Sequence, residues 1–389
     1  LIFQRLLCFV ISVACTLAIG TLSLWPFDFD FGVNRNHVEW KMEGSGLSFQ
    51  KRGQLLSLVP PERFYHRIST GSGLTVEAWI RSYLSSQSGP ARILSYSGDP
   101  LHRNFSLAQS GDALIMRLRT TKTDLNGMNP HFKAPRVFHD TDGQKDIQYV
   151  VFTYDCRNAC AFIDGREYLC DNSIGGDFLD WDPEHRLVIG NEVTADRPWL
   201  GEIHAAAIYS RALTPVEIRN AFSRGQPRHP FDDAWPKDPE RLVAYLFSGP
   251  GSVTTVGRTL GAIPFQLYRP KTLPPFPFDL AGRSAMREFL PSNLIPNLAG
   301  FIPIGFFLSC ALQRRNASGR WAFLCVLALG FLIAFGIEYL QHYLPAKHSS
   351  RPELLMKSTG LIVGMVLQTV VAGHGRSQLA SCFGLRRYP

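Results

Sequence analysis

The sequence lacks a concentrated basic region, although its formal net charge is +8 at pH 7. Its lysine and arginine residues form neither a stripe nor an arginine-rich tail, and many of them flank apolar runs. Proteins that bind nucleic acid gather their basic residues on one face or in one tail. We therefore expect no nucleic-acid partner.

Motifs of the common catalytic chemistries are also missing. The chain has no P-loop, no Ser-His-Asp order and no paired metal-ligand motif. Each of these motifs brings particular reactive groups together at a fixed spacing, and without them no particular reaction is indicated. The absence favours a binding or structural role over an enzymatic one.

Long apolar runs lie toward both ends of the chain. Residues 6–25 carry no charge over 20 positions, which is the length that a helix needs to cross a bilayer. We favour an uncleaved span over a signal peptide, because no small-x-small cleavage site precedes Trp25. Further apolar runs at 293–312, 321–340 and 354–372 predict a second, third and fourth span.

Basic residues in short loops predict the orientation of these spans. The loop 313–320 holds arginines and no acid, which indicates the cytoplasmic side, and the tail after residue 372 is also basic. With four spans, both termini are then expected in the cytoplasm. The segments 26–290 and 341–353 are expected outside.

The middle of the chain has the pattern of a β-rich soluble domain. Short alternating runs separated by turn residues recur between residues 36 and 225. Roughly ten to fourteen such strands indicate a two-sheet sandwich. A short helix is expected at 214–225, with Thr214 as its N-cap and Glu217 at the third position of a capping box.

The cysteines of this domain leave their pairing open. Cys160 and Cys170 lie at opposite ends of one expected hairpin, and Cys156 and Cys160 flank another tight connection. One disulfide is expected, with one thiol left over. The cysteines of the apolar runs are interpreted as packing residues: Cys8, Cys15, Cys310 and Cys325.

The strand patterns resemble a laminin G-like, concanavalin A-type jelly roll. The runs that carry the resemblance, in family order, include "LTVEAWIRS", "VVFTYD", "RLVIGNE" and "PWLGEIHAAAIYSRALTPVEI". It implies a lectin-like sandwich that binds glycans, often with calcium as a cofactor. Glucanases of this fold carry two glutamates in an E-x-D-x-x-E run on one strand. No such run occurs here, so hydrolysis by this domain is not expected.

Polar and aromatic residues on the turns of the sandwich are the candidate ligand contacts. They are Asp99, Arg103, Asn104, Trp181 and Asn191.

A candidate calcium site lies in the loop 175–185, where Asp177, Asp180 and Asp182 surround Trp181. Carboxylate oxygens at this spacing suit calcium, and a solvated acidic loop is the favoured alternative. No other cofactor is expected.

Both ends of the chain resemble the VanZ-like membrane family, which is named after a teicoplanin-resistance protein. The resemblance is carried by "WPFDFDF" after the first span, "NLIPNLAGFIPIGF" in the second, "IEYLQHYLP" ending the third and "SSRPELLMKSTG" opening the fourth. It departs from the family at Glu353 and Lys357, where Asp and Asn are usual. The departure at Lys357 places a cation where a neutral amide is expected.

Polar residues of the expected spans gather at one level, near the outer end of the bilayer. They are Asn293, Asn297, Glu338, Gln341, Arg351 and Glu353. Ionisable groups at such positions often mark a site. We expect an ion pair between Glu338 and Arg351. Either Glu338 acts there as an acid or base, or the pair clamps the helices.

The expected fold class is mixed, a four-helix transmembrane module (all-α) with an inserted all-β two-sheet jelly-roll sandwich. The expected boundaries are 1–28 for the first helix, 29–228 for the sandwich, 229–285 for a Pro-rich connector with some strand, 286–375 for the other helices and 376–389 for a cytoplasmic tail.

We expect a multi-pass protein of the bacterial cytoplasmic membrane whose extracytoplasmic sandwich binds a glycan or wall polymer. The VanZ resemblance implies a link to glycopeptide resistance. The alternative is a membrane-embedded enzyme that acts on an envelope precursor through Glu338, Gln341 and Arg351. The sequence leaves the oligomeric state open.

Overall fold

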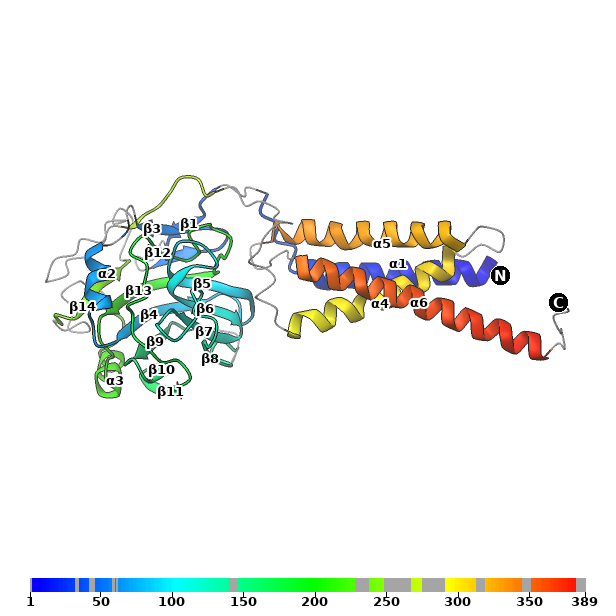
Figure 1. Ribbon diagram of the computed structural model, residues 1–389. Helices are drawn as coiled ribbons and strands as arrows, with labels where there is room; N and C mark the ends of the chain where they lie inside the picture. The colour runs from blue at the N-terminus through cyan, green and yellow to red at the C-terminus, as the bar shows by residue number, and fades with distance from the viewer. Residues whose placement is uncertain are drawn as a thin grey trace. The chain divides into compact units, whose positions relative to one another are not determined.

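The chain divides into two compact units in the computed structural model (Figure 1). The first is built from Leu1–Phe29, Pro277–Leu344 and His348–Pro389, and the second is mainly Asp30–Phe276. The structure describes residues 2–382 except 32–34, 42–45, 58–59, 61, 140–145, 228–237, 248–266, 275–290, 313–318 and 345–350.

Long helices make up the first unit, which we call the membrane module. They are α1 (Ile2–Leu24), α4 (Pro291–Leu312), α5 (Gly319–Gln341) and α6 (Arg351–Cys382), and they run side by side in Figure 1. Each contains an apolar segment long enough to cross a membrane: Phe3–Leu24, Ile295–Leu312, Trp321–Gln341 and Pro352–Ala372. The four expected spans are therefore confirmed as helices.

Glycines let α4 and α6 approach each other backbone to backbone. A Cβ on Gly305 would lie 2.1 Å from the carbonyl oxygen of Leu361, and one on Gly364 would lie 2.1 Å from that of Ile302. Small residues at such contacts are the usual means by which membrane helices pack closely. Helix α1 packs against both α4 and α5, which completes the module.

The second unit is a sandwich of two antiparallel sheets, which confirms the expected all-β architecture. One sheet has eight strands in the order β1-β2-β13-β4-β9-β10-β11, with β14 also paired to β13. The other has seven strands in the order β15-β3-β12-β5-β6-β7-β8.

The strands of the eight-stranded sheet are β1 (Val38–Trp40), β2 (Leu47–Phe49), β4 (Leu74–Ser82), β9 (Gln148–Tyr154), β10 (Ala159–Ile163), β11 (Arg166–Asp171), β13 (Gly201–Tyr209) and β14 (Arg241–Leu246). Those of the seven-stranded sheet are β3 (Leu55–Ser57), β5 (Gln87–Ser97), β6 (Arg103–Gly111), β7 (Ala113–Leu118), β8 (Phe132–Ala134), β12 (Arg186–Ile189) and β15 (Leu267–Tyr268). Two short helices complete the unit: α2 (Glu62–Ser69) and α3 (Pro215–Arg224).

Alternation along the strands builds the core. In β4, Val76 and Ile80 belong to the cluster between the sheets, whereas Trp79 belongs to a second cluster on the opposite face. There the ring of Trp79 stacks on Phe222 of α3 at 6.0 Å, so α3 covers this face. The capping box of α3, with Thr214 as N-cap, is present as expected. Burial of each large apolar side chain contributes roughly 1.5–3 kcal/mol.

The two ends of the sandwich meet. Arg35 forms an isolated β-bridge with Thr272, and the side-chain amide of Asn36 donates to the carbonyl of Pro270 at 2.9 Å. Strand β15 pairs with β3, and β14 pairs with β13. The stretch expected as a connector thus contributes a strand to each sheet, and the compact unit extends to Phe276 rather than ending near 228.

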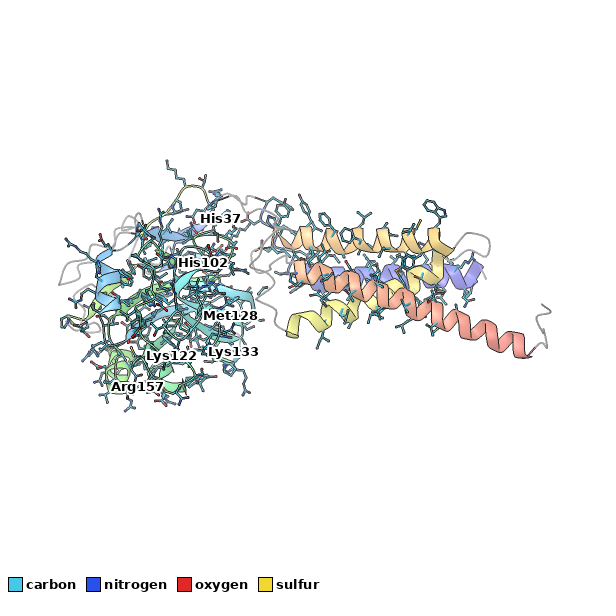
Figure 2. All side chains as sticks on the ribbon, in the orientation of Figure 1. His37, His102, Lys122, Met128, Lys133 and Arg157 are labelled. Carbon is cyan, nitrogen blue, oxygen red and sulfur yellow. A yellow bond between two sulfur atoms is a disulfide. The ribbon has the colours of Figure 1, made fainter. Side chains whose placement is uncertain are left out.

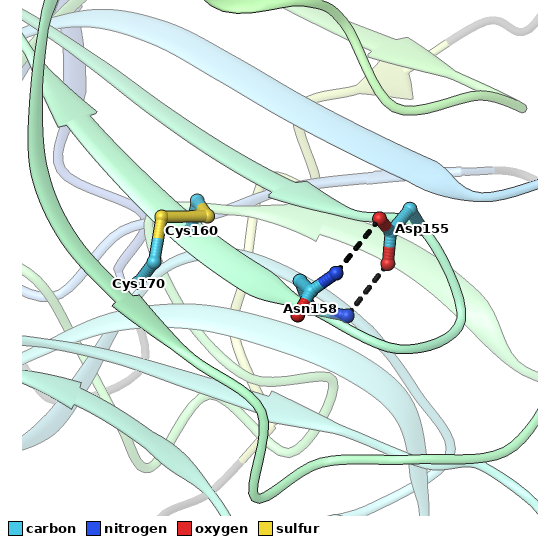
Figure 3. The surroundings of a disulfide bond; sticks show 4 residues. All are labelled: Asp155, Asn158, Cys160 and Cys170. Atoms are coloured by element: carbon cyan, nitrogen blue, oxygen red, sulfur yellow. Dashed lines mark hydrogen bonds between the residues drawn. A yellow bond between two sulfur atoms is a disulfide. The ribbon is translucent and has the colours of Figure 1, made fainter.

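A disulfide joins Cys160 of β10 to Cys170 of β11, at directly paired positions (Figure 3). Of the pairings that the sequence left open, this one is formed, and Cys156 keeps its free thiol. Strand β11 is an edge strand of its sheet, and all of its residues except the last are exposed. The disulfide therefore holds an edge strand that buries little apolar surface.

Replacing both Cys160 and Cys170 by serine should release β11. Because the disulfide closes a short loop, its loss should lower the free energy of unfolding by roughly 2–3 kcal/mol. Urea unfolding together with hydrogen exchange of the β11 amides measures this. Cys156→Ser is the matched control, and an equal loss of stability in that variant would contradict the assignment.

Candidate functional site

Two loops come together at one end of the seven-stranded sheet. Strand β12 pairs with β5 so that Arg186 lies opposite Ser97, which places His185 beside Gly98. A Cβ on Gly98 would lie 3.0 Å from Nδ1 of His185. The turn between β5 and β6 and the loop before β12 are therefore in contact. We call Tyr96, Asp99, His102, Asp182 and His185 the rim site.

The turn between β5 and β6 is organised by Asp99. Its Oδ1 accepts from the backbone N–H groups of Leu101 at 2.7 Å and His102 at 2.9 Å. Its Oδ2 lies 2.8 Å from Nδ1 of His102, and both side chains are about half exposed (Figure 2 labels His102). Burial acts to raise the pKa of Asp99, but the hydrogen bonds from His102 and the backbone outweigh it and lower the pKa. Asp99 is thus an anion at neutral pH.

The second loop repeats this arrangement with a buried histidine. Nδ1 of His185 lies 3.9 Å from Oδ2 of Asp182, which is partly exposed. Nε2 of His185 is buried and has no hydrogen-bond partner in the described part of the chain. Burial lowers the pKa of His185, although the charge of Asp182 acts to raise it. The floor of the rim site therefore offers a neutral imidazole with an unused nitrogen, which costs stability unless something binds to it.

Aromatic rings support the site from below. The ring of Tyr96 lies 5.8 Å from that of Trp181 and 6.4 Å from that of His185. Trp181 is only 3 % exposed, and its Nε1 donates to the carbonyl of Arg119 at 2.7 Å. Trp181 is therefore a support of the site and not the surface contact that its place in an acidic loop suggested.

Several of the residues that were expected to contact a ligand instead form hydrogen bonds within the protein. The side chain of Asn104 is buried, donating to the backbone carbonyl of Asp182 and accepting from its N–H, each at 2.8 Å. Arg103 is buried and donates to Ser106 Oγ at 3.2 Å. Asn191 is buried elsewhere, against Gly53. Arg103, Asn104 and Asn191 brace loops in this structure, and Asp99 alone of the five expected contacts presents much of its side chain to solvent.

The expected calcium ligands do not converge. Asp177 and Asp180 are exposed, and Asp177 and Asp182 each accept from a backbone N–H two residues later. Within the described ranges, no group of three His, Cys, Asp or Glu side chains is placed to hold a metal ion. Backbone N–H groups of the loop 175–185 thus occupy an oxygen of Asp177 and an oxygen of Asp182.

Sequence reasoning missed both histidines of the rim site. A signal was present, because the pattern D-P-x-H occurs in "DPLH", 99–102, and in "DPEH", 182–185. In both copies the aspartate side chain contacts the histidine three residues later. The recurrence of this four-residue pattern in two loops was the available signal that the two histidines belong to one site.

A second polar group lies inside the membrane module. Nζ of Lys357 in α6 donates to Oε1 of Glu338 in α5, and both side chains are almost completely buried. Lysine near a helix end often extends to the interface, but here the close approach of the helices directs it inward. Glu338 therefore has Lys357 as a partner. The side chain of Arg351 lies outside the described residues, so the expected Glu338–Arg351 pair stays a prediction.

Among the other expected members of this group, Gln341 has a partner on a third helix. Gln341 is buried, and its Nε2 donates to the carbonyl of Ser23 in α1 at 3.0 Å. Asn297 and Glu353 are half-buried. The side chain of Asn293 lies outside the described residues. Gln341 thus links α5 to α1, and Glu338 links α5 to α6.

Comparisons with known proteins match two separate segments of the chain. Residues 59–219 match the concanavalin A-like lectin/glucanases superfamily, and residues 247–372 match VanZ/LLP1. A search of curated proteins gives no match.

Solved structures similar to this chain include a native heptameric SAP-like pentraxin from Limulus polyphemus. It has 15 % sequence identity and a TM-score of 0.36, covering 54 % of this chain and 98 % of the pentraxin. Domain 4 of AbnA, an extracellular arabinanase from Geobacillus stearothermophilus, in complex with arabinotriose, has 16 % identity and a TM-score of 0.34. That likeness covers 47 % of this chain and 78 % of the domain.

Replacing Lys357 by methionine should destabilise the membrane module. Glu338 would then lose the buried ammonium group that donates to its Oε1, and removing one partner of a buried pair costs roughly 3–5 kcal/mol. The double variant Glu338→Met with Lys357→Met should recover most of this loss, because no buried charge remains. Thermal unfolding in detergent measures both variants, and a single variant as stable as the wild type would contradict the buried pair.

The free energy of unfolding of the sandwich should fall as the pH is lowered, and His185 is a group that causes this fall. Its folded pKa lies below the unfolded value of about 6.5, so the unfolded chain takes up the proton first. Stability is then lost as the pH falls below about 6.5, until the folded pKa is reached. The urea midpoint, followed by near-ultraviolet circular dichroism, should depend less on pH in His185→Gln.

His131 provides a second measure of the same effect, because burial also lowers its pKa. Combining His131→Gln with His185→Gln should flatten the pH dependence further. If the urea midpoint depends on pH equally in the wild type and in these variants, the role given to the two histidines is contradicted.

Proposed function

Because the chain joins a concanavalin A-like domain to a VanZ/LLP1 segment with membrane-length helices, we propose that it is a membrane-anchored envelope protein whose sandwich binds a glycan or wall polymer. We place the sandwich on the outer side of the bacterial cytoplasmic membrane. The disulfide of the sandwich supports this placement, because disulfides persist in oxidising compartments. The basic loop 313–320 supports it as well.

The rim site carries the proposal. A sugar offers hydroxyl groups that both donate and accept hydrogen bonds. Asp99 and Asp182 accept such bonds at the surface, and the unused Nε2 of buried His185 offers one more partner beneath them. Binding sites for small polar ligands commonly place a few convergent polar groups on an apolar support, and the buried rings of Tyr96 and Trp181 pack beneath these groups here.

The charge of the rim site selects among saccharides. With a neutral His185, the carboxylates of Asp99 and Asp182 leave the surface negative. An acidic polymer is repelled from such a surface, and a neutral sugar is not. We therefore assign neutral sugar units as the ligand class.

Binding is favoured over hydrolysis at this site. Glycoside hydrolysis needs one carboxyl group that keeps its proton and acts as the acid. The pKa of Asp99 is lowered, so this group is ionised and donates no proton. The alternative of a membrane-embedded enzyme would need Glu338 to exchange a proton, and Lys357 holds that carboxylate. A link to teicoplanin-type resistance has only the VanZ/LLP1 match in its support.

The test is binding of the full-length protein, purified in detergent, to an array of neutral and acidic wall polysaccharides. Asp99→Asn keeps an oxygen that accepts from the turn but removes the charge, so it should weaken binding to neutral polymers by roughly tenfold or more.

Asp155→Asn is the matched control. Asp155 organises a similar turn through Asn158, as Figure 3 shows, but lies in the loop between β9 and β10. The control should bind as the wild type does. Binding to no neutral polymer, or equal binding by Asp99→Asn and the wild type, would overturn the proposal.

A further inference from the structure

Two thiols of the membrane module face each other across 302 residues of sequence. Sγ of Cys8 in α1 lies 2.7 Å from Sγ of Cys310 in α4. This separation is only about 0.7 Å longer than a disulfide bond. Sequence reasoning interpreted both as packing residues, and the structure shows instead that they contact each other.

The neighbouring packing holds these sulfurs in place. Helix α1 packs against α4, and a Cβ on Gly300 would lie 2.7 Å from Ile19 Cδ1, so the two helices are close along their length. Cys8 is 8 % exposed and Cys310 is half-buried. Both sulfurs are therefore partly covered by the packed helices, and Cys310 is the more exposed of the two.

The pair also lies near an end of each helix. Cys310 precedes the last residue of α4, Leu312, by two positions, and Cys8 lies in the second turn of α1, which begins at Ile2. At 1.5 Å per residue, Cys8 is about 9 Å from the start of its helix. Water and small oxidants reach this depth more easily than the middle of a bilayer.

We propose that Cys8 and Cys310 form a reversible dithiol site that a small peroxide oxidises to a disulfide. One sulfur attacks a peroxide oxygen, the O–O bond breaks, and the sulfur becomes a sulfenic acid while water leaves. The second thiol then attacks that sulfur, an S–S bond replaces the S–O bond, and a second water leaves. Two thiols and one hydrogen peroxide thus give one disulfide and two waters.

The consequence is a covalent tie between α1 and α4, the two helices that flank the sandwich in sequence. The other thiols of the module are placed differently. Cys15 packs against the apolar core of the module, and Cys325 is exposed. These two cysteines supply matched controls.

The test uses the full-length protein in membrane vesicles treated with hydrogen peroxide, followed by alkylation of the remaining thiols. Cyanogen bromide cuts after methionine, and the chain has 6 of them. Cuts after Met42, Met286 and Met356 release the fragment 1–42, with Cys8, and the fragment 287–356, with Cys310. On a gel without reductant, these fragments should migrate together after peroxide treatment and separate after dithiothreitol.

Serine variants identify the sulfurs. The linked species should disappear in Cys8→Ser and in Cys310→Ser, and should persist in Cys15→Ser and Cys325→Ser. The disulfide Cys160–Cys170 lies within one fragment, 129–286, and does not link the two fragments of interest. The proposal is overturned if peroxide produces no linked species in the wild type, or if the link survives in Cys8→Ser.

Discussion

The sandwich closes on itself where Arg35 meets Thr272, and the rest of the architecture depends on this closure. Asn36 reinforces it by bonding to Pro270, and β15 completes it by pairing with β3. A domain whose two ends meet can be inserted into another without separating the parts on either side. Accordingly, α1 and α4 pack against each other although the whole sandwich lies between them in sequence.

Most of the fold was predictable because its signals are local. Alternation with period two, as along 73–82, and uncharged runs of bilayer length, as at 6–25, each depend on neighbouring residues only. The end of the sandwich was harder to predict. Its last strand pairs, β14 with β13 and β15 with β3, join distant segments, and the proline-rich stretch between them gives a weak strand pattern.

The sites were less predictable because each depends on contacts between remote segments. Asp99 was singled out from its turn, but His185 gains its meaning only from the pairing of β12 with β5. Lys357 near the start of a helix is usually interfacial, and only the packing of α5 on α6 shows that it faces Glu338. No local pattern relates Cys8 to Cys310, so sequence reasoning assigned them to packing.

The buried pair of Glu338 and Lys357 also constrains biosynthesis. A helix that enters the bilayer alone exposes each of its charges to lipid, at a cost of roughly 2.5–3.5 kcal/mol for a lysine at its centre. Here the acid lies on α5 and the base on α6, which follows directly in the chain. The two helices neutralise each other only as a hairpin, so the translocon is expected to release them to the lipid together and not one after the other.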